Sequence, residues 1–205
     1  MSFRSPHEFE NDLDALEAVE KATTRFVGHA VHDLLPIAAQ QFQGIAVGTG
    51  VGDRANYLGE DLTRLALDRI GASRVIDGRL FGTTDYKLAS YQFLPDFAVR
   101  QALFVDSKAE KNALNVARIQ VTQTSLEVRQ FRDSGPICVA GRVPPIWSSQ
   151  DGHDYLPTTV FVKYHYRQSA EGLELRVVSV VALPHAFLQE IYNPTAADRI
   201  WNVGP

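Results

Sequence analysis

Two acidic residues and a lysine near the middle of the chain have the types and the spacing for hydrolytic chemistry. Asp106 and Lys108 close the segment Leu103-Phe104-Val105-Asp106-Ser107-Lys108, and Asp85 precedes Asp106 by 21 residues. Residues i and i+2 of a β-strand project from the same face. An apolar strand that ends here would therefore present Asp106 and Lys108 side by side, with Asp85 joining them from a neighbouring strand.

Two carboxylates and an ammonium group around one point are the functional groups needed to hydrolyse a phosphodiester bond with water. Mg²⁺ prefers oxygen ligands, so Asp85 and Asp106 would each supply a carboxylate oxygen and Ser107 its backbone carbonyl. The cation, Mg²⁺ or Mn²⁺ in its place, would lower the pKa of a bound water and neutralise phosphate charge. Lys108 would orient or help deprotonate that water and stabilise the transition state.

A short acid–lysine pattern can also be an ordinary ion pair at the end of a strand. Three features favour the functional reading here. The pattern follows a strongly apolar run, and a second acid precedes it at a plausible hairpin distance. In addition, Asp85 lies within residues 79–87, which read as a strand, and acids are depleted in strands unless something requires them.

The elements that must position these residues fall into two parts. Residues 8–34 repeat apolar positions at three- and four-residue steps, which predicts one long helix. Residues 59–70 predict a second helix, with Glu60 in its first turn. The helix dipole explains an acid there, and Glu60 is also a candidate to face the metal site. Pro36 and the glycines up to Gly52 predict a break and a loop-rich passage between the helices.

The remainder of the chain is rich in β-strand patterns. Strands are expected at residues 79–87, 99–108, 135–144, 158–167 and 173–183, the last of them central in the sheet. A turn is expected at 94–96, helix or loop at 109–120, and a short helix at 184–192. This mixture predicts an α/β (α+β) fold with one mixed sheet flanked by helices. A single domain of 205 residues is expected, mainly helical over 1–70 and sheet-rich over 71–205.

Composition narrows the classes of protein. Hydrophobic residues make up 45% of the chain, enough for a sizeable core, yet no apolar stretch is long enough to span a membrane. The N-terminus lacks a signal-peptide pattern, and the single Cys138 rules out an internal disulfide. We therefore expect a protein of a prokaryotic-type cytoplasm. The net charge of −4 is concentrated in residues 1–70, which leaves the catalytic part near neutral and compatible with a DNA-facing surface.

Two other kinds of site are disfavoured by their motifs. Gly48-Thr49-Gly50-Val51-Gly52 resembles a phosphate loop only in its glycines. Such loops need a strand before them and a helix directly after, whereas here Asp53-Arg54-Ala55-Asn56 follows, without Gly-Lys-Ser/Thr. The six histidines include no H-E-x-x-H or H-x-H pair, which argues against a zinc hydrolase.

Asp85 with Asp106-Ser107-Lys108 is similar to the PD-(D/E)xK signature of type II restriction endonucleases, although Thr84 stands where that signature has proline. The chain most resembles the SfiI kind of these enzymes, which is related in fold to BglI and the EcoRV branch. The similar segments occur in order over most of residues 15–195: Leu16–Lys21, Gly59–Thr63, Asp85–Lys87, Leu103–Asn112, Val160–Val162, Tyr166–Arg167, Leu183–Ala186 and Tyr192–Pro194.

The resemblance implies a sequence-specific, Mg²⁺-dependent endonuclease that cuts double-stranded DNA as a homodimer or a dimer of dimers. It also implies Asp85 and Asp106 as metal ligands and Lys108 as the catalytic lysine. Members of that family continue well past the Tyr-Asn-Pro segment, where we expect basic residues that read bases, whereas this chain ends at Pro205. The resemblance therefore leaves the target sequence open.

DNA contacts are expected from basic residues around and after the candidate site. Arginine matches guanine O6 and N7, although most protein–DNA hydrogen bonds go to the backbone. The candidates are Lys87, Lys111, Arg118, Arg129, Arg132, Arg142 and Arg199. Two alternatives stay open at this point: a junction or repair nuclease of the same superfamily, and a DNA-binding protein that keeps the fold without activity.

Overall fold

The computed structural model describes ten segments of the chain: residues 4–69, 73–74, 89–93, 99–111, 118–119, 124–125, 127–132, 134–148, 152–183 and 202–203. Its helices all lie in the first of these segments. They are the 3₁₀ turn η1 (Pro6–Phe9), α1 (Leu13–His32), α2 (Leu35–Gln43) and α3 (Val51–Arg69). None of the helices in this part of the chain is long and apolar enough to cross a membrane.

The larger of the two sheets in the described residues has mixed strand directions, as the sequence predicts. β3 (Gln101–Glu110) pairs in parallel with β8 (Asp154–Ser169) and antiparallel with β2 (Ala89–Phe93). β8 also pairs antiparallel with β9 (Gly172–Leu183), and the short strands β1 (Ser73–Arg74) and β7 (Trp147–Ser148) extend the sheet. The smaller sheet has the order β4 (Arg118–Ile119), β10 (Asn202–Val203), β5 (Val128–Arg132) and β6 (Gly135–Val139).

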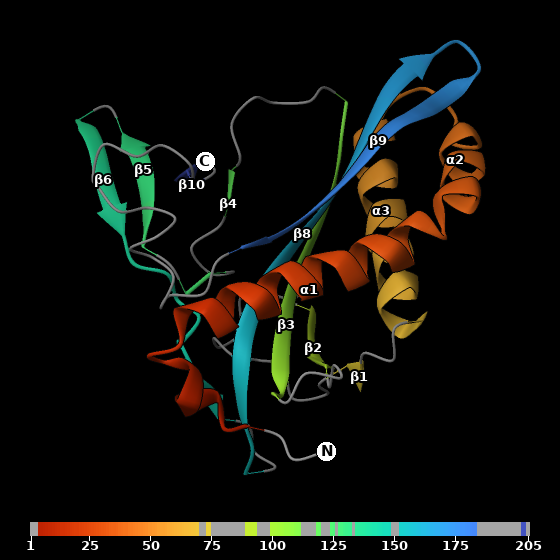
Figure 1. Cartoon of the computed structure of the whole chain (residues 1–205). Helices are drawn as coiled ribbons and strands as arrows, with labels where there is room; N and C mark the ends of the chain where they lie inside the picture. The colour runs from red at the N-terminus through yellow and green to blue at the C-terminus, as the bar shows by residue number, and fades with distance from the viewer. Residues whose placement is uncertain are drawn as a thin grey trace.

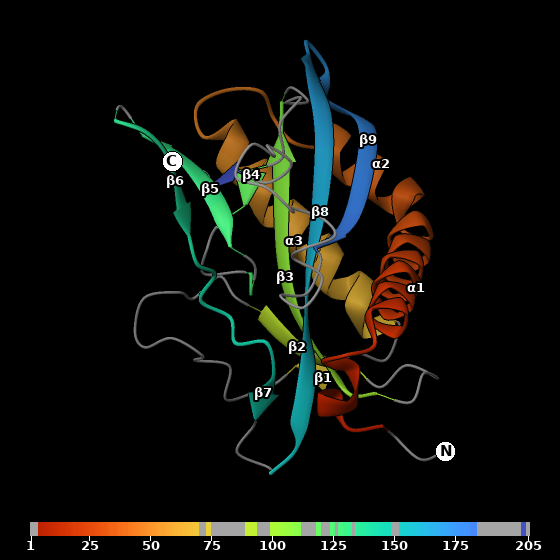
Figure 2. The same ribbon diagram turned by 60° about the vertical axis from the view of Figure 1, so that its left-hand side comes forward.

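The three α-helices of the described residues contribute to a core against one face of the larger sheet (Figure 1). The buried set includes Val27 from α1, Phe42 from α2 and Leu62 from α3, packed against alternate residues of β3 and β8 such as Val105 and Val162. The smaller sheet lies on the other side of β3 and β8, as the turned view shows (Figure 2). We call the two sides of the larger sheet the helix face and the open face.

The α1 helix begins at Leu13, directly after its N-capping residue Asp12. Asp12 accepts a hydrogen bond from the backbone N–H of Ala15, which satisfies one of the free donors of the first turn. Leu16, Val19 and Val27 then recur on the buried face, as the apolar pattern predicts. The predicted single helix over 8–34 is wrong at its start, because η1 and a turn precede α1.

The predicted loop-rich passage after Pro36 is wrong over much of its length. Pro36 lies in the first turn of α2, where its missing N–H costs no hydrogen bond, and Phe42 buries that helix against Tyr164 and Tyr166. α3 begins at Val51, eight residues earlier than predicted. The segment Gly48–Gly52 therefore does lead into a helix, but the element before it is α2 rather than the strand that a phosphate loop needs.

The strand predictions need three corrections. β3 continues through Ala109 and Glu110, and residues 118–119 form β4, so residues 109–120 are not simply helix or loop. The expected strand at 135–144 ends at Val139. β9 is not central, since among the described strands it pairs with β8 alone. The predicted strand at 79–87, the turn at 94–96 and the helix at 184–192 lie outside the described residues.

Candidate active site

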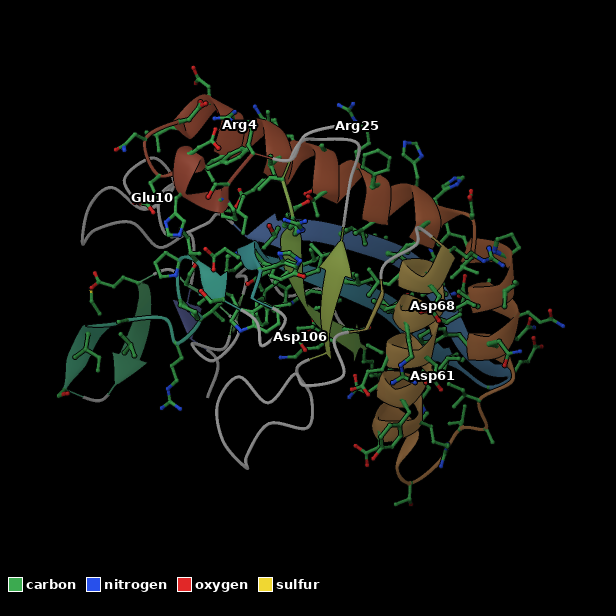
Figure 3. All side chains as sticks on the ribbon, turned by 90° about the horizontal axis from the view of Figure 1, so that it is seen from below. Arg4, Glu10, Arg25, Asp61, Asp68 and Asp106 are labelled. Atoms are coloured by element: carbon green, nitrogen blue, oxygen red, sulfur yellow. The ribbon has the colours of Figure 1, made fainter. Side chains whose placement is uncertain are left out.

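Strand β3 presents different chemistry on its two faces. Along its second half, buried residues alternate with partly exposed ones, which is the period of a strand with two distinct faces. Val105 and Ala109 pack into the core of the helix face. Asp106, Lys108 and Glu110 therefore project from the open face, and Asp106 lies on the side of the sheet away from α1 (Figure 3).

Asp106 and Lys108 form an ion pair on the open face. The Lys108 Nζ atom lies 3.3 Å from Asp106 Oδ2. The Asp106 side chain is 11% exposed and that of Lys108 34%, so the pair is largely shielded from solvent while the ammonium still reaches the surface. This is the side-by-side placement that the i, i+2 spacing predicts for the end of an apolar strand.

A second ion pair lies directly beside the first. Lys163 on β8 is the register partner of Lys108, and its Nζ lies 3.2 Å from Glu110 Oε1. The side chains of Lys163 and Glu110 are 18% and 22% exposed. Neither residue is among those predicted from the sequence to form the site. A signal was present, since Lys163 lies between the alternating apolar residues Val162 and Tyr164, on the opposite face of the predicted strand, and Glu110 follows Lys108 by two positions.

A hydrogen-bonded cluster supports this part of β3 from the helix face. Thr63 Oγ1 on α3 lies 2.9 Å from Ser107 Oγ and 3.1 Å from the Tyr164 hydroxyl. Burial raises the pKa of Tyr164, against a smaller opposing effect of the Thr63 hydrogen bond, so this hydroxyl stays protonated at neutral pH. Gly59 allows the close approach, because a Cβ there would lie 3.0 Å from Tyr164 Cδ2.

α3 also completes the hydrogen bonding of β3 at its end. The register of β2 with β3 covers residues 101–105 of β3. Beyond that point, Asn56 Oδ1 accepts a hydrogen bond from the Ala109 backbone N–H at 2.8 Å. A helix side chain thus takes the place of a strand partner beside Lys108, and the segment from Asp106 to Glu110 is held from both directions.

The other predicted site residues are only partly described. Glu60 is half-buried on α3, Lys111 is exposed directly after β3, and Arg142 is exposed after β6. Asp85, Lys87 and Arg199 lie outside the described residues, as do the side chains of Arg118, Arg129 and Arg132. In the described part of the chain, no three His, Cys, Asp or Glu residues come together as potential metal ligands.

The arrangement of strands and helices is that of restriction endonucleases. The crystal structure of the tetrameric restriction endonuclease SfiI bound to cognate DNA matches 89% of this chain and 70% of that chain, with a TM-score of 0.70 and 27% identity. The structure of the restriction endonuclease BglI bound to its DNA recognition sequence matches 95% of this chain and 81% of that one, with a TM-score of 0.68 and 15% identity. The fold class predicted from the sequence is confirmed.

The sequence comparisons identify the family within this class. The family model described as type II restriction enzyme SfiI matches residues 46–205. The type II restriction enzyme SfiI of Streptomyces fimbriatus is 32% identical over 208 residues, which cover 95% of this chain and 75% of that enzyme. The chain belongs to the SfiI family of type II restriction enzymes, and it is a sequence-specific restriction endonuclease.

Proposed function

We propose that this chain hydrolyses phosphodiester bonds of double-stranded DNA at a site formed by Asp85, Asp106 and Lys108 with a divalent cation, Mg²⁺ or Mn²⁺. The observation that carries the proposal is the largely buried Asp106–Lys108 ion pair on the open face of β3. Family membership supports the reaction, site-specific cleavage of DNA. The ion pair supports the assignment of that reaction to these residues.

Asp106 has the chemistry and the burial of a ligand for a hard cation. Carboxylate and carbonyl oxygens are the donors that Mg²⁺ and Mn²⁺ prefer, so we assign Asp106 and the Ser107 carbonyl to the cation. Asp85 is the proposed second carboxylate. It precedes Ala89 by four residues, and Ala89 is the register partner of Val105, the neighbour of Asp106.

Glu60 stays a predicted ligand with less support. It follows Gly59 on α3 and is half-buried. The hydrogen bonds from α3 reach the Ser107 side chain on the helix face of β3 and the Ala109 N–H at its edge, and neither is on the face of Asp106. An exchange of Glu60 for Gln is therefore expected to reduce cleavage less than the corresponding exchange at Asp106.

Lys108 supplies the fixed positive charge of the proposed site. When bound, the cation would activate a water and neutralise charge on the scissile phosphate. The Lys108 ammonium is a compact charge with three donors, and Asp106 holds it 3.3 Å from Oδ2 on the open face. From that position it stabilises the negative charge that develops on the phosphate oxygens, at no cost of reorganisation during the reaction.

Duplex DNA is expected to lie on the open face, where Asp106 and Lys108 project. The related SfiI structure is a tetramer bound to cognate DNA, and the BglI structure is bound to its recognition sequence. We therefore propose that this chain binds duplex DNA as a homodimer or a tetramer. Lys111 and Arg142 are exposed and available for phosphate contacts. Lys87, Arg118, Arg132 and Arg199 complete the proposed DNA-binding set.

Digestion of plasmid and phage DNA, with and without Mg²⁺, tests the proposed function. Discrete fragments that disappear when the cation is chelated are expected. Lys108→Ala is expected to bind DNA and to cut at least ~10²-fold more slowly, because one preorganised charge is lost at the reacting phosphate. Lys21→Ala, an exposed lysine on α1 paired with Glu17, is the matched control and should cut normally.

Three outcomes would contradict the proposal. Near-normal turnover by Lys108→Ala would refute the assignment of the site. Cleavage of branched but not linear duplexes would indicate a structure-specific nuclease, whereas DNA binding without any cleavage would indicate a non-catalytic module.

A further inference from the structure

Four charged side chains alternate in sign on the open face where β3 meets β8. Asp106, Lys108 and Glu110 follow one another at two-residue steps on β3, and Lys163 lies beside Lys108 on β8. They are joined as two separate pairs: Lys108 Nζ with Asp106 Oδ2 at 3.3 Å, and Lys163 Nζ with Glu110 Oε1 at 3.2 Å. All four side chains are between 11% and 34% exposed, so their charges are only weakly screened by solvent.

Lys108 has a carboxylate two residues away on each side. On a strand, residues i−2 and i+2 lie on the same face at equal distances from residue i. The flexible four-carbon stem of lysine can carry its ammonium in either direction along that face. In the structure Lys108 forms an ion pair with Asp106, and Glu110 accepts a hydrogen bond from Lys163 instead.

The geometry points to Lys163 as a positioning residue: by holding Glu110, it keeps the Lys108 ammonium at Asp106. This inference rests on the proposed catalytic role of Lys108. The Glu110 carboxylate has no second bond to hold it, because its Oε2 atom is buried and has no hydrogen-bond partner among the described residues. In the same part of the chain, no hydrogen bond joins Glu110 to His165, its register partner on β8.

Removal of the Lys163 charge leaves a largely buried carboxylate that lacks a counter-ion. A buried charge without its partner is strongly unfavourable, so Glu110 gains from any cation on its own face. Lys108 is the next cation along that face of β3, two residues away. Once drawn to Glu110, its ammonium no longer lies beside Asp106, where the proposed reaction requires it.

A direct role of Lys163 in DNA binding would have different consequences. A lysine that contacts a phosphate contributes to affinity and to its salt dependence, whatever the charge at position 110. A positioning lysine acts through Glu110, so its loss should be compensated when the Glu110 charge is removed as well. The two roles are therefore separated by the double variant Lys163→Gln/Glu110→Gln.

The test compares single-turnover cleavage at saturating enzyme, DNA affinity and thermal unfolding for a set of full-length variants. Lys163→Gln keeps an N–H donor for Glu110 but removes the charge, and it is expected to cut about ten-fold or more slowly with unchanged affinity. Lys163→Gln/Glu110→Gln is expected to regain most of that rate. Lys163→Arg, which keeps the charge, is expected to lose less rate than Lys163→Gln. A crystal structure of Lys163→Gln should show Lys108 Nζ bonded to Glu110.

Three results would overturn the inference: equal rates for the single and the double variant, a loss of DNA affinity in Lys163→Gln that the second change does not restore, or a Lys108 side chain that stays at Asp106 in the Lys163→Gln crystal. If Lys163→Gln does not fold, the double variant Lys163→Gln/Glu110→Gln provides the test by itself. A folded double variant that cuts as slowly as Lys108→Ala contradicts the positioning role of Lys163. Active Lys108→Ala would refute the proposed function itself. If Lys108→Ala is inactive and the addition of Glu110→Gln does not restore the activity of Lys163→Gln, only the role of Lys163 is refuted.

Discussion

Thr63 Oγ1 and Ser107 Oγ lie 2.9 Å apart, in a buried hydrogen bond that joins α3 to the residue between Asp106 and Lys108. The Tyr164 hydroxyl, 3.1 Å from the same Thr63 oxygen, extends the contact to β8. One threonine thus fixes both strands that carry the charged pairs of the open face. Buried polar clusters of this kind are stable only when each member has a partner.

Replacement of Thr63 by valine is expected to lower the free energy of unfolding by about 1–3 kcal/mol. Valine keeps the shape of threonine but leaves the hydroxyls of Ser107 and Tyr164 without the Thr63 oxygen in a buried place. Urea unfolding measures the loss. Thr63→Ser keeps the hydroxyl and should be more stable than Thr63→Val. Equal stability of valine and wild-type proteins would show that the cluster contributes nothing.

Two helical glycines are expected to respond in opposite directions to alanine. At Gly59 a Cβ would lie 3.0 Å from Tyr164 Cδ2, so Gly59→Ala forces α3 away from the sheet, at a cost of about 1–3 kcal/mol that outweighs the gain in helix propensity. Apart from its own turn of α1, no atom of the described residues lies within 4 Å of a Cβ at Gly28, so Gly28→Ala should stabilise the protein by about 0.5–1 kcal/mol. Thermal unfolding of the two variants measures whether each change lowers or raises the stability of the protein.

The sequence predicts strand β3 well because its signal is local. The apolar run up to Val105 sets the strand, and the two-residue period then places Asp106 and Lys108 on one face. The resemblance to SfiI-type enzymes predicts the fold as well, because the similar segments are spread over most of the chain. Helix α1 is predicted for the same local reason, its regular apolar face.

The features that the sequence does not predict depend on distant contacts. A proline such as Pro36 can mark either the end of one helix or the start of the next. The helix α2 forms because Phe42 packs against the apolar face of the sheet, a contact that the local sequence does not reveal. β8 and β9 have similar apolar patterns, and pairing with β3 makes β8 the inner strand. The Lys163–Glu110 pair joins residues 53 positions apart, which no local pattern can bring together.

Removal of the Asn56 side chain is expected to loosen the end of β3. Asn56 Oδ1 is the acceptor for the Ala109 N–H, so Asn56→Ala leaves that amide exposed to exchange. Loss of one such hydrogen bond, about 1 kcal/mol, corresponds to several-fold faster hydrogen exchange at Ala109. Asn56→Asp keeps an acceptor and should protect the amide. Slow exchange at Ala109 in Asn56→Ala would show that another group satisfies the N–H.

His7 is expected to give the stability of the protein a dependence on pH. Its ring nitrogens lie 2.7 Å from Glu10 Oε1 and 3.2 Å from Asp154 Oδ2, which ties η1 to the start of β8. The hydrogen bond to Glu10, with a smaller contribution from Asp154, raises the pKa of His7 above its ordinary 6.5. The stabilisation is therefore complete below pH 6.5 and is lost as the pH rises through the higher pKa of the folded protein. His7→Asn should lower the melting temperature more at pH 5.5 than at pH 8.5.

The magnitude of this pH effect is limited by exposure, because all three side chains are at least one-third exposed and salt screens their attraction. The difference between wild-type and His7→Asn proteins should consequently shrink in 1 M NaCl at pH 5.5. Glu10→Gln removes the main partner of His7, so in that background His7→Asn should have a smaller effect at low pH. A melting-temperature difference that is the same at pH 5.5 and pH 8.5 would show that the protonated imidazole contributes nothing to stability.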